Sequence, residues 1–362
     1  MNQLIRYGAR ERYFAEANLY PNHRLARIIT QFKNLYKIVT ETGECMAEIS
    51  GKLRYEAKGL FEYPAVGDFV MVDRSSDSSG NAIIYRVLTR KSAFQRAAAG
   101  TEHQTQVAAN IDSVFICMSL NNDYNLSRLE RYLSIAWNSC ATPVVVLTKA
   151  DLCEDLPARL AEISAVAPGT DVVVTSSHDR ASCDKLLPWL QPGMTVSFIG
   201  SSGVGKSTLI NRLAGDELLM TSEIRRDDKG RHTTTRRDML ILPRGGIVID
   251  TPGMRELGLE AVDLSKSFSD IDDLARKCRF RDCKHTTEPD CAVLQALEDG
   301  TLAERRLQNY QKLKREAHYD GLSSKQIETK KLNAMFESVG GMKNAKKFIR
   351  QNNKREGNTK KL

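Results

Sequence analysis

The octapeptide GSSGVGKS, at positions 200–207, is the stretch of this sequence with the clearest chemical meaning. It matches the pattern G-x-x-x-x-G-K-[ST], whose glycines let consecutive backbone N–H groups turn inward around phosphate oxygens. Lys206 would supply a positive charge at the outer phosphates, and the Ser207 hydroxyl would bind Mg²⁺. TVSFI before the loop is typical of a buried strand, and STLINRLAG after it is typical of a helix whose N-terminus faces the anion. The expected phosphate contacts are Gly200, Ser201, Ser202, Gly203, Val204, Gly205, Lys206, Ser207 and Thr208.

A second phosphate element is predicted in IVIDTPG, at positions 247–253, where an apolar strand ends in D-x-x-G. Asp250 at the end of this strand could hold the hydration shell of Mg²⁺, and the backbone N–H of Gly253 could reach a γ-phosphate. The pattern is short and common. Its place after an apolar strand, roughly forty residues beyond the glycine-rich loop, supports the interpretation.

The stretch VVVLTKAD, at positions 144–151, indicates a guanine-binding corner. Asp151 could accept hydrogen bonds from N1–H and the 2-amino group of guanine, whereas adenine would leave a carboxylate unpaired. The Lys149 stem could lie over the base and Thr148 could anchor the loop, while Ala150 lies between Lys149 and Asp151. Asn is commoner than Thr at the first position. After the next predicted strand, Ser176 and Ser177 could complete the base pocket.

An alternative for this stretch is an ordinary strand-to-helix turn in which Asp151 caps the helix. The order of the motifs also needs an explanation, because in most GTPases the guanine corner follows the phosphate loop. In an open parallel sheet, ligands bind at the carboxyl ends of the strands, and all four elements follow predicted strands. A circularly permuted GTPase domain therefore accounts for the order, provided that the ancestral termini lay close together.

The predicted elements divide the chain into several parts. Short strands punctuated by turns between about Leu25 and Leu88 predict a small β-barrel of the oligonucleotide-binding type. Apolar runs then alternate with amphipathic helices such as residues 125–140, which indicates a mainly parallel sheet covered on both faces. We expect a barrel domain with an N-terminal extension at 1–97, a permuted GTPase domain at 98–262, a helical zinc-binding domain at 263–340 and a basic tail at 341–362.

Three cysteines and one histidine cluster within fourteen residues, at Cys278, Cys283, His285 and Cys291. Three thiolates and one imidazole suffice for tetrahedral Zn²⁺. The segment is polar and offers little apolar surface for a core, so the metal would supply much of its folding energy. A redox role of these thiols is the alternative.

The positive charge is concentrated at the C-terminal end. Residues 304–362 carry sixteen Lys or Arg against six Asp or Glu, while the whole chain has a net charge of +8. A basic segment after a nearly neutral body favours a polyanionic partner, with nucleic acid first among the choices and a solvated tail as the alternative. No apolar run reaches the length of a membrane span, and the N-terminus lacks the apolar core of a signal peptide, so we expect a cytoplasmic protein.

The motifs together resemble one family. TKAD, GSSGVGKS, GRHTTT (230–235) and DTPG, followed by Cys278-x₄-Cys283-x-His285-x₅-Cys291, resemble the bacterial small-ribosomal-subunit-dependent GTPase A family in this order, and PAVGDFV (64–70) extends the resemblance to the barrel. The resemblance implies a barrel, a permuted GTPase domain and a zinc domain. It also implies binding to the small (30S) subunit and its 16S rRNA late in assembly, with GTP hydrolysis stimulated by the particle. We expect a monomer that uses GTP or GDP, Mg²⁺ and one Zn²⁺.

The water-orienting residue is the least determined part of the site. Many GTPases place Gln directly after D-x-x-G, but Met254 occupies this position and cannot orient water. His232 is the best candidate in the chain, and the resemblance points to the same residue; the alternative is an exposed loop histidine. Thr233 or Thr234 is expected to cover Mg²⁺ and the γ-phosphate. Two other functions stay open: a P-loop ATPase or kinase, and a nucleotide-gated RNA-binding protein with negligible hydrolysis.

Overall fold

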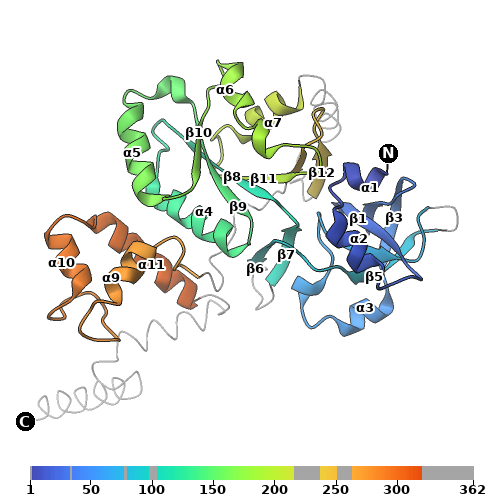
Figure 1. The fold of residues 1–362 in the computed structure, drawn as a ribbon, viewed down its shortest axis with the longest axis horizontal. Helices are drawn as coiled ribbons and strands as arrows, with labels where there is room; N and C mark the ends of the chain where they lie inside the picture. Colours follow the sequence, from blue (N-terminus) through green and yellow to red (C-terminus); the bar gives the residue numbers. More distant parts are fainter. Residues whose placement is uncertain are drawn as a thin grey trace, which may run out of the picture.

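The structure is a computed structural model that describes residues 2–32, 35–76, 80–97, 104–215, 237–250 and 263–319. Figure 1 shows three parts: a barrel near the N-terminus, a central sheet with helices, and a helical C-terminal part on the side of the central part away from the barrel. The basic tail and the expected residues His232, Thr233, Thr234 and Gly253 lie outside the described residues.

Five strands form the N-terminal barrel: β1 (Arg24–Gln31), β2 (Tyr36–Val39), β3 (Glu44–Ile49), β4 (Phe69–Val72) and β5 (Ala82–Val87). They pair in the order β1-β2-β3-β5-β4, and β4 pairs with β1 to close the barrel. Apolar side chains that alternate along the strands, among them Ile28, Ile38 and Ile84, are fully buried inside it. The predicted barrel is confirmed.

Short helices surround the barrel. α1 (Gln3–Arg6) and α2 (Glu11–Ala17) precede it, and α3 (Gly51–Glu56) and a 3₁₀ turn, η1 (Leu60–Glu62), connect β3 to β4. The ring of Tyr13 on α2 stacks on Phe69 of β4 with centroids 3.8 Å apart. This contact anchors the N-terminal extension to the outside of the barrel.

A two-stranded hairpin, β6 (Ala93–Ala97) and β7 (Gln104–Ala109), leads from the barrel to the central part. The domain boundary expected after residue 97 falls between these two paired strands. The boundary itself stays a prediction.

The central sheet has the strand order β10-β9-β8-β11-β13-β12. Five neighbouring strands run parallel: β8 (Ser113–Ser119), β9 (Thr142–Thr148), β10 (Asp171–Val174), β11 (Thr195–Ile199) and β13 (Ile247–Asp250). β12 (Arg237–Ile241) pairs antiparallel with β13. The predicted, mainly parallel sheet is confirmed.

Helices cover both faces of this sheet. α4 (Leu126–Asn138) and α5 (Leu156–Val166) share one buried cluster with Ile116 of β8, while α6 (Arg180–Asp184) and α7 (Lys206–Ala214) share another with Phe115. Successive residues of β8 therefore point to opposite faces, and both faces are apolar, as in strands buried on both sides. Two 3₁₀ turns, η2 (Ala150–Leu152) and η3 (Leu187–Trp189), complete the connections.

The barrel and the central sheet are joined through their backbones, which was not predicted. β12 pairs with β1 as well as with β13, so one continuous sheet of eleven strands runs through both parts. Arg27 of β1 is fully buried at this joint and donates hydrogen bonds to the carbonyl of Gly67 and the hydroxyl of Thr195. Burial lowers the pKa of Arg27 to about 10.

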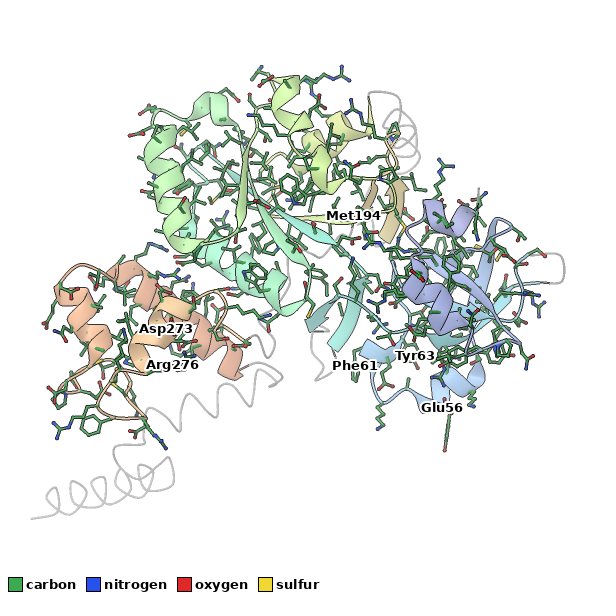
Figure 2. The ribbon with its side chains drawn as sticks, viewed as in Figure 1. Glu56, Phe61, Tyr63, Met194, Asp273 and Arg276 are labelled. Carbon is green, nitrogen blue, oxygen red and sulfur yellow. The ribbon has the colours of Figure 1, made fainter. Side chains whose placement is uncertain are left out.

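The N-terminal extension also reaches this joint. Arg10 forms a 2.8 Å ion pair with Asp112, next to Met194 at the beginning of the β11 region (Figure 2). The carboxylate of Asp112 accepts a hydrogen bond of 2.8 Å from the backbone N–H of Thr195. The extension therefore contacts the central sheet as well as the barrel.

The C-terminal part consists of α9 (Ser269–Ala275), α10 (Ala292–Glu298) and α11 (Glu304–Tyr319). Leu307, Tyr310 and Leu313 recur every three residues along α11 and are buried, so one face of this helix is turned inward. α11 packs against α4 of the central part.

Candidate nucleotide and metal sites

Glycines shape the loop between β11 and α7. Gly200 has a backbone φ of 145°, and a Cβ atom there would lie 2.5 Å from the carbonyl oxygen of Cys117 on β8, so a side chain would clash. Gly203 and Gly205 have φ values of 74° and 105°, which glycine adopts without the steric cost that other residues incur. The chain turns sharply through these residues before α7 begins at Lys206.

The loop and the start of α7 carry several polar side chains. The Lys206 ammonium donates hydrogen bonds to the carbonyl oxygens of Gly200 (2.7 Å) and Ser201 (2.6 Å), and so it bridges two backbone carbonyls of the loop. Ser207 and Thr208 are exposed on the first turn of α7, and Ser202 is exposed on the loop. The N-terminus of α7, an ammonium and an exposed hydroxyl form a donor set that suits a Mg²⁺-bound phosphate group.

The predicted guanine corner is tied directly to the phosphate loop. Thr148, the last residue of β9, is buried, and its Oγ1 donates a 2.6 Å hydrogen bond to the carbonyl oxygen of Val204. The next residue, Lys149, adopts a left-handed conformation with φ of 56°, and the backbone N–H of Ala150 bonds the carbonyl of Thr175. The corner is therefore bonded both to the phosphate loop and to the end of β10.

The carboxylate of Asp151 lies on the η2 turn, where its Oδ1 accepts a 2.5 Å hydrogen bond from Ser176 Oγ. This bond is the main cause that holds the pKa of Asp151 below its ordinary value, and the positive charge of Lys149 at longer range adds to the effect. The helix after the corner, α5, is capped by Asp155, whose carboxylate accepts from the N–H of Ala158. Asp151 is thus not the cap of α5 and keeps part of its side chain open to solvent.

Two further predicted residues lie at the same edge of the sheet. Ser177 is exposed, and its carbonyl oxygen accepts a hydrogen bond of 2.8 Å from Arg212 of α7. β13 runs parallel to β11 and ends at Asp250. Because β9, β10, β11 and β13 are parallel, the guanine corner, the serine pair, the phosphate loop and Asp250 all follow the carboxyl ends of strands.

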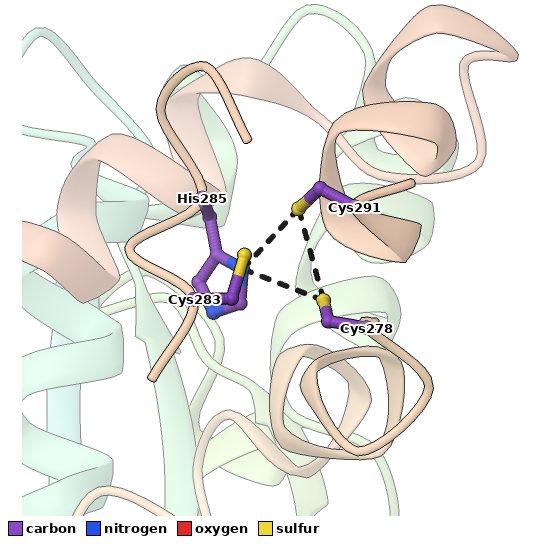
Figure 3. Close-up of side chains that lie close together, drawn as sticks. All are labelled: Cys278, Cys283, His285 and Cys291. Atoms are coloured by element: carbon purple, nitrogen blue, oxygen red, sulfur yellow. Dashed lines mark hydrogen bonds between the residues drawn. The ribbon is translucent and has the colours of Figure 1, made fainter. Parts of the chain in front are cut away.

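The cysteine cluster is compact. The ligand atoms of Cys278, Cys283, His285 and Cys291 all lie within 4.8 Å of one another (Figure 3). Cys278 follows α9, and Cys291 is the N-cap residue of α10. His285 adopts a left-handed backbone with φ of 57°, as does Asp290 with φ of 56°, so two tight turns bring the connecting segment back to the helices.

The spacing of these atoms fits tetrahedral zinc. With Zn–S bonds of about 2.3 Å, two sulfur ligands of a tetrahedral ion lie about 3.8 Å apart. Cys278 Sγ and Cys291 Sγ are 3.7 Å apart, and His285 Nδ1 is 3.4 Å from Cys291 Sγ and 3.7 Å from Cys278 Sγ. Three thiols and one imidazole at these separations can hold one Zn²⁺ ion with a closed coordination sphere, as in structural zinc sites.

Comparisons with known proteins agree with this arrangement. The family model described as RsgA GTPase matches residues 87–260. Small ribosomal subunit biogenesis GTPase RsgA 2 of Lactiplantibacillus plantarum is 48% identical over 344 residues, covering 95% of this chain and 97% of the relative. Small ribosomal subunit biogenesis GTPase RsgA of Methanosarcina acetivorans is 46% identical over 292 residues, covering 79% of this chain and 78% of the relative. The chain belongs to the RsgA GTPase family.

Solved structures extend the similarity to the fold. The crystal structure of YjeQ from Thermotoga maritima matches this RsgA family member with a TM-score of 0.60 and 28% identity, over 82% of this chain and 98% of the other. The structure described as YloQ, a circularly permuted GTPase, matches with a TM-score of 0.58 and 25% identity, over 82% and 95% of the two chains. The permuted motif order is thus accompanied by a permuted GTPase fold.

Two features of this RsgA site were not predicted. Asp123, in the loop after β8, accepts a hydrogen bond from Ser201 of the phosphate loop, and Arg212 of α7 donates to the carbonyl oxygen of Ser177, a residue of the predicted base pocket. Each pair is far apart in the sequence and belongs to no motif, so no local pattern could have indicated it. The pairing of β8 with β11 places the loop that holds Asp123 beside the phosphate loop. This pairing can be read from the folded sheet but not from a local sequence pattern.

Proposed function

We propose that this chain binds GTP and GDP with Mg²⁺ and hydrolyses GTP as part of small ribosomal subunit biogenesis in the cytoplasm. Membership of the RsgA GTPase family and the names of the relatives support this function. Among the described residues, no helix has the length and apolar character needed to cross a bilayer. The proposed working form is a monomer that binds the small (30S) subunit through its 16S rRNA.

The described residues have distinct roles in this proposal. Asp151 would accept hydrogen bonds from N1–H and the 2-amino group of guanine, with Ser176 orienting its carboxylate. Lys206 would exchange the carbonyls of Gly200 and Ser201 for phosphate oxygens, and Ser207 would bind Mg²⁺. Mg²⁺ would neutralise charge that develops on the phosphates, with Asp250 holding its hydration shell.

The proposal includes residues outside the described part of the chain. Thr233 or Thr234 would cover Mg²⁺ and the γ-phosphate, the Gly253 N–H would contact the γ-phosphate, and His232 would orient the attacking water. A His232→Ala variant should keep its affinity for GTP and lose most of the hydrolysis that small subunits stimulate. An unchanged stimulated rate would exclude His232 from this role.

The C-terminal part would act as the RNA-facing end. One Zn²⁺ held by Cys278, Cys283, His285 and Cys291 would stabilise the segment between α9 and α10. Arg279 lies over the ring of Phe280, which is 40% exposed in the same segment. An exposed aromatic ring beside cationic side chains suits a nucleic acid with unpaired bases, and the basic tail would add salt-sensitive phosphate contacts.

The hydrogen bond between Thr148 and Val204 is the observation that most strongly supports a guanine nucleotide site. It ties the base-recognition corner to the phosphate loop, so one nucleotide could engage both. A P-loop ATPase or kinase has no need for this link or for the exposed carboxylate of Asp151.

The test is co-sedimentation of the chain with purified small ribosomal subunits in the presence of GDP, ADP or a non-hydrolysable GTP analogue. We expect the GTP analogue to give the strongest association and ADP to have no effect beyond that of the nucleotide-free protein. Large ribosomal subunits at the same concentration are the control. Equal association with both kinds of subunit, or the same effect of ADP and the GTP analogue, would contradict the proposal.

A further inference from the structure

An acidic side chain outside the predicted motifs touches the phosphate loop. Asp123 lies in the loop between β8 and α4, and its Oδ2 accepts a hydrogen bond from Ser201 Oγ. Its Oδ1 accepts a bond of 2.8 Å from Arg128 on the first turn of α4. The same Ser201 provides a carbonyl oxygen to the ammonium of Lys206. Ser201 therefore links Asp123 to Lys206, the lysine expected to bind the phosphates.

Local hydrogen bonds fix the position of Asp123. Asn121 Oδ1 accepts from the Ser119 hydroxyl at the end of β8 and from the backbone N–H of Asp123. Asn125 caps α4 by accepting from the N–H of Arg128. The bonds from Ser201 and Arg128, together with the charge of Lys149, hold the pKa of Asp123 below its ordinary value, so the group is ionised at neutral pH.

The helix that begins beside Asp123 also holds the C-terminal part. Glu130, on the next turn of α4, is fully buried, and its carboxylate accepts from Arg305, Arg306 and Asn309 of α11. Arg306 is itself buried and forms a second ion pair of 2.7 Å with Asp270 of α9. α4 is thus linked to the phosphate loop through Arg128 and Asp123. It is linked to α11 through Glu130, and Arg306 of α11 continues this link to Asp270 of α9.

We propose that Asp123 is a positioning residue of the phosphate loop. Through Glu130, α4 would then transmit changes at this loop to the C-terminal part. This inference rests on the proposed binding of guanine nucleotides. When Lys206 leaves the carbonyl of Ser201 for a phosphate oxygen, the loop next to Asp123 changes its bonding. A helix of thirteen residues is stiff over this length, and the buried contacts of Glu130 leave it little freedom to move independently of α11.

The coupling predicts two separable effects. Asp123→Ala removes the acceptor of Ser201 and should weaken GDP binding about three- to tenfold, because the loop is less well ordered before the nucleotide arrives. Glu130→Gln leaves the phosphate loop intact and should change GDP affinity less than about twofold. Asp184→Asn, at an exposed carboxylate of α6, is the control.

Hydrogen–deuterium exchange of residues 304–319, with and without GDP or a GTP analogue, provides the second readout. The wild-type protein should show a nucleotide-dependent change in this segment, and both Asp123→Ala and Glu130→Gln should abolish it. A double-mutant cycle of Asp123→Ala and Ser201→Ala should be non-additive for GDP affinity, since each removes the same bond.

The outcomes separate the inference from the proposed function. If the wild-type protein binds no guanine nucleotide, the proposed function fails. If it binds GDP normally but Asp123→Ala has wild-type affinity, or α11 responds to nucleotide in that variant as in the wild type, the inference is overturned.

Discussion

Thr148 Oγ1 donates a hydrogen bond of 2.6 Å to the backbone carbonyl oxygen of Val204. The two residues are separated by 56 positions and belong to the two motifs whose order is reversed in this chain. Most GTPases place Asn at the position of Thr148. A buried threonine that bonds the phosphate loop can take over the anchoring role, because one hydroxyl donor is sufficient to satisfy the carbonyl.

Thr148→Val removes this donor while it keeps the shape of the side chain. We expect GDP affinity to fall about five- to tenfold, equivalent to about 1 to 1.4 kcal/mol, because the carbonyl of Val204 loses its partner in a buried position. Fluorescence titration with a labelled GDP measures the effect. Thr148→Ser keeps the hydroxyl and should bind within about twofold of the wild type. Equal affinities of the Val and wild-type proteins would show that the bond does not organise the site.

Asp151→Asn should convert the base preference from guanine to xanthine. An amide donates to the 2-keto oxygen of xanthine, whereas it cannot accept both donors of guanine. We expect GTP affinity to fall at least about a hundredfold and XTP affinity to rise, as measured by competition against labelled nucleotide. The matched control, Asp184→Asn, makes the same chemical change at an exposed position of α6. A variant that binds ATP and GTP as the wild type does would contradict guanine recognition by Asp151.

The preference for GDP over ADP should be independent of pH between about 5 and 8. The bond from Ser176 lowers the pKa of Asp151 below its ordinary value of 3.8, so the carboxylate is ionised across this range and is lost only as pH falls through the lowered pKa. Using the ratio of the two affinities cancels the titration of the diphosphate itself. His178→Gln, which removes the neighbouring imidazole, is the control. If the preference of His178→Gln for GDP over ADP fell with a midpoint near pH 6, guanine recognition by the Asp151 carboxylate would be contradicted.

Removal of zinc should unfold the C-terminal part and spare the nucleotide site. Cys278, Cys283, His285 and Cys291 belong to the connection between α9 and α10, and the candidate nucleotide residues follow the strands of the central sheet. We expect one zinc per chain by metal analysis, and loss of protease resistance after residue 263 when a chelator is added, with GDP affinity changed less than about threefold. Cys291→Ser should behave like the chelated protein, and Cys140→Ser, at an exposed cysteine, like the wild type. Full zinc content in Cys291→Ser would contradict this ligand set.

Glu130→Ala should weaken the attachment of α11 to α4. Its buried carboxylate is the acceptor for Arg305, Arg306 and Asn309, so its loss leaves buried donors unpaired and should cost about 2 to 4 kcal/mol in the free energy of unfolding. Glu316→Ala removes the acceptor of Arg131 at a more exposed point of the same interface and should cost under about 1 kcal/mol. Urea denaturation measures both. Equal costs would mean that burial does not decide the strength of the interface.

Within each motif, the sequence indicates the local geometry of the candidate site. The phosphate loop, the guanine corner and the metal cluster each carry their geometry in a short stretch, where glycines, a strand end or ligand spacing determine the local structure. The central strands were predicted as continuous apolar runs between helices, since such runs leave few other assignments. For example, TVSFI, the strand expected before the phosphate loop, is β11 (Thr195–Ile199).

Contacts between distant segments could not be predicted in this way. Glu130 and Arg306 are charged residues on amphipathic helices, where charge normally indicates a solvent-facing position, yet both are buried because they pair with each other. The pairing of β12 with β1 joins segments that are more than two hundred residues apart, and no local sequence pattern indicates it. Asp123 was missed for the same reason.

The proposed GTPase activity and its stimulation can be measured by single-turnover hydrolysis of GTP with and without purified small ribosomal subunits. We expect slow hydrolysis by the chain alone, because Met254 occupies the usual position of a water-orienting Gln, and acceleration by about tenfold or more when small subunits are added. Large subunits should have no such effect. Normal binding of GTP with the same hydrolysis rate in the presence and absence of small subunits would contradict a GTPase stimulated by the ribosomal particle.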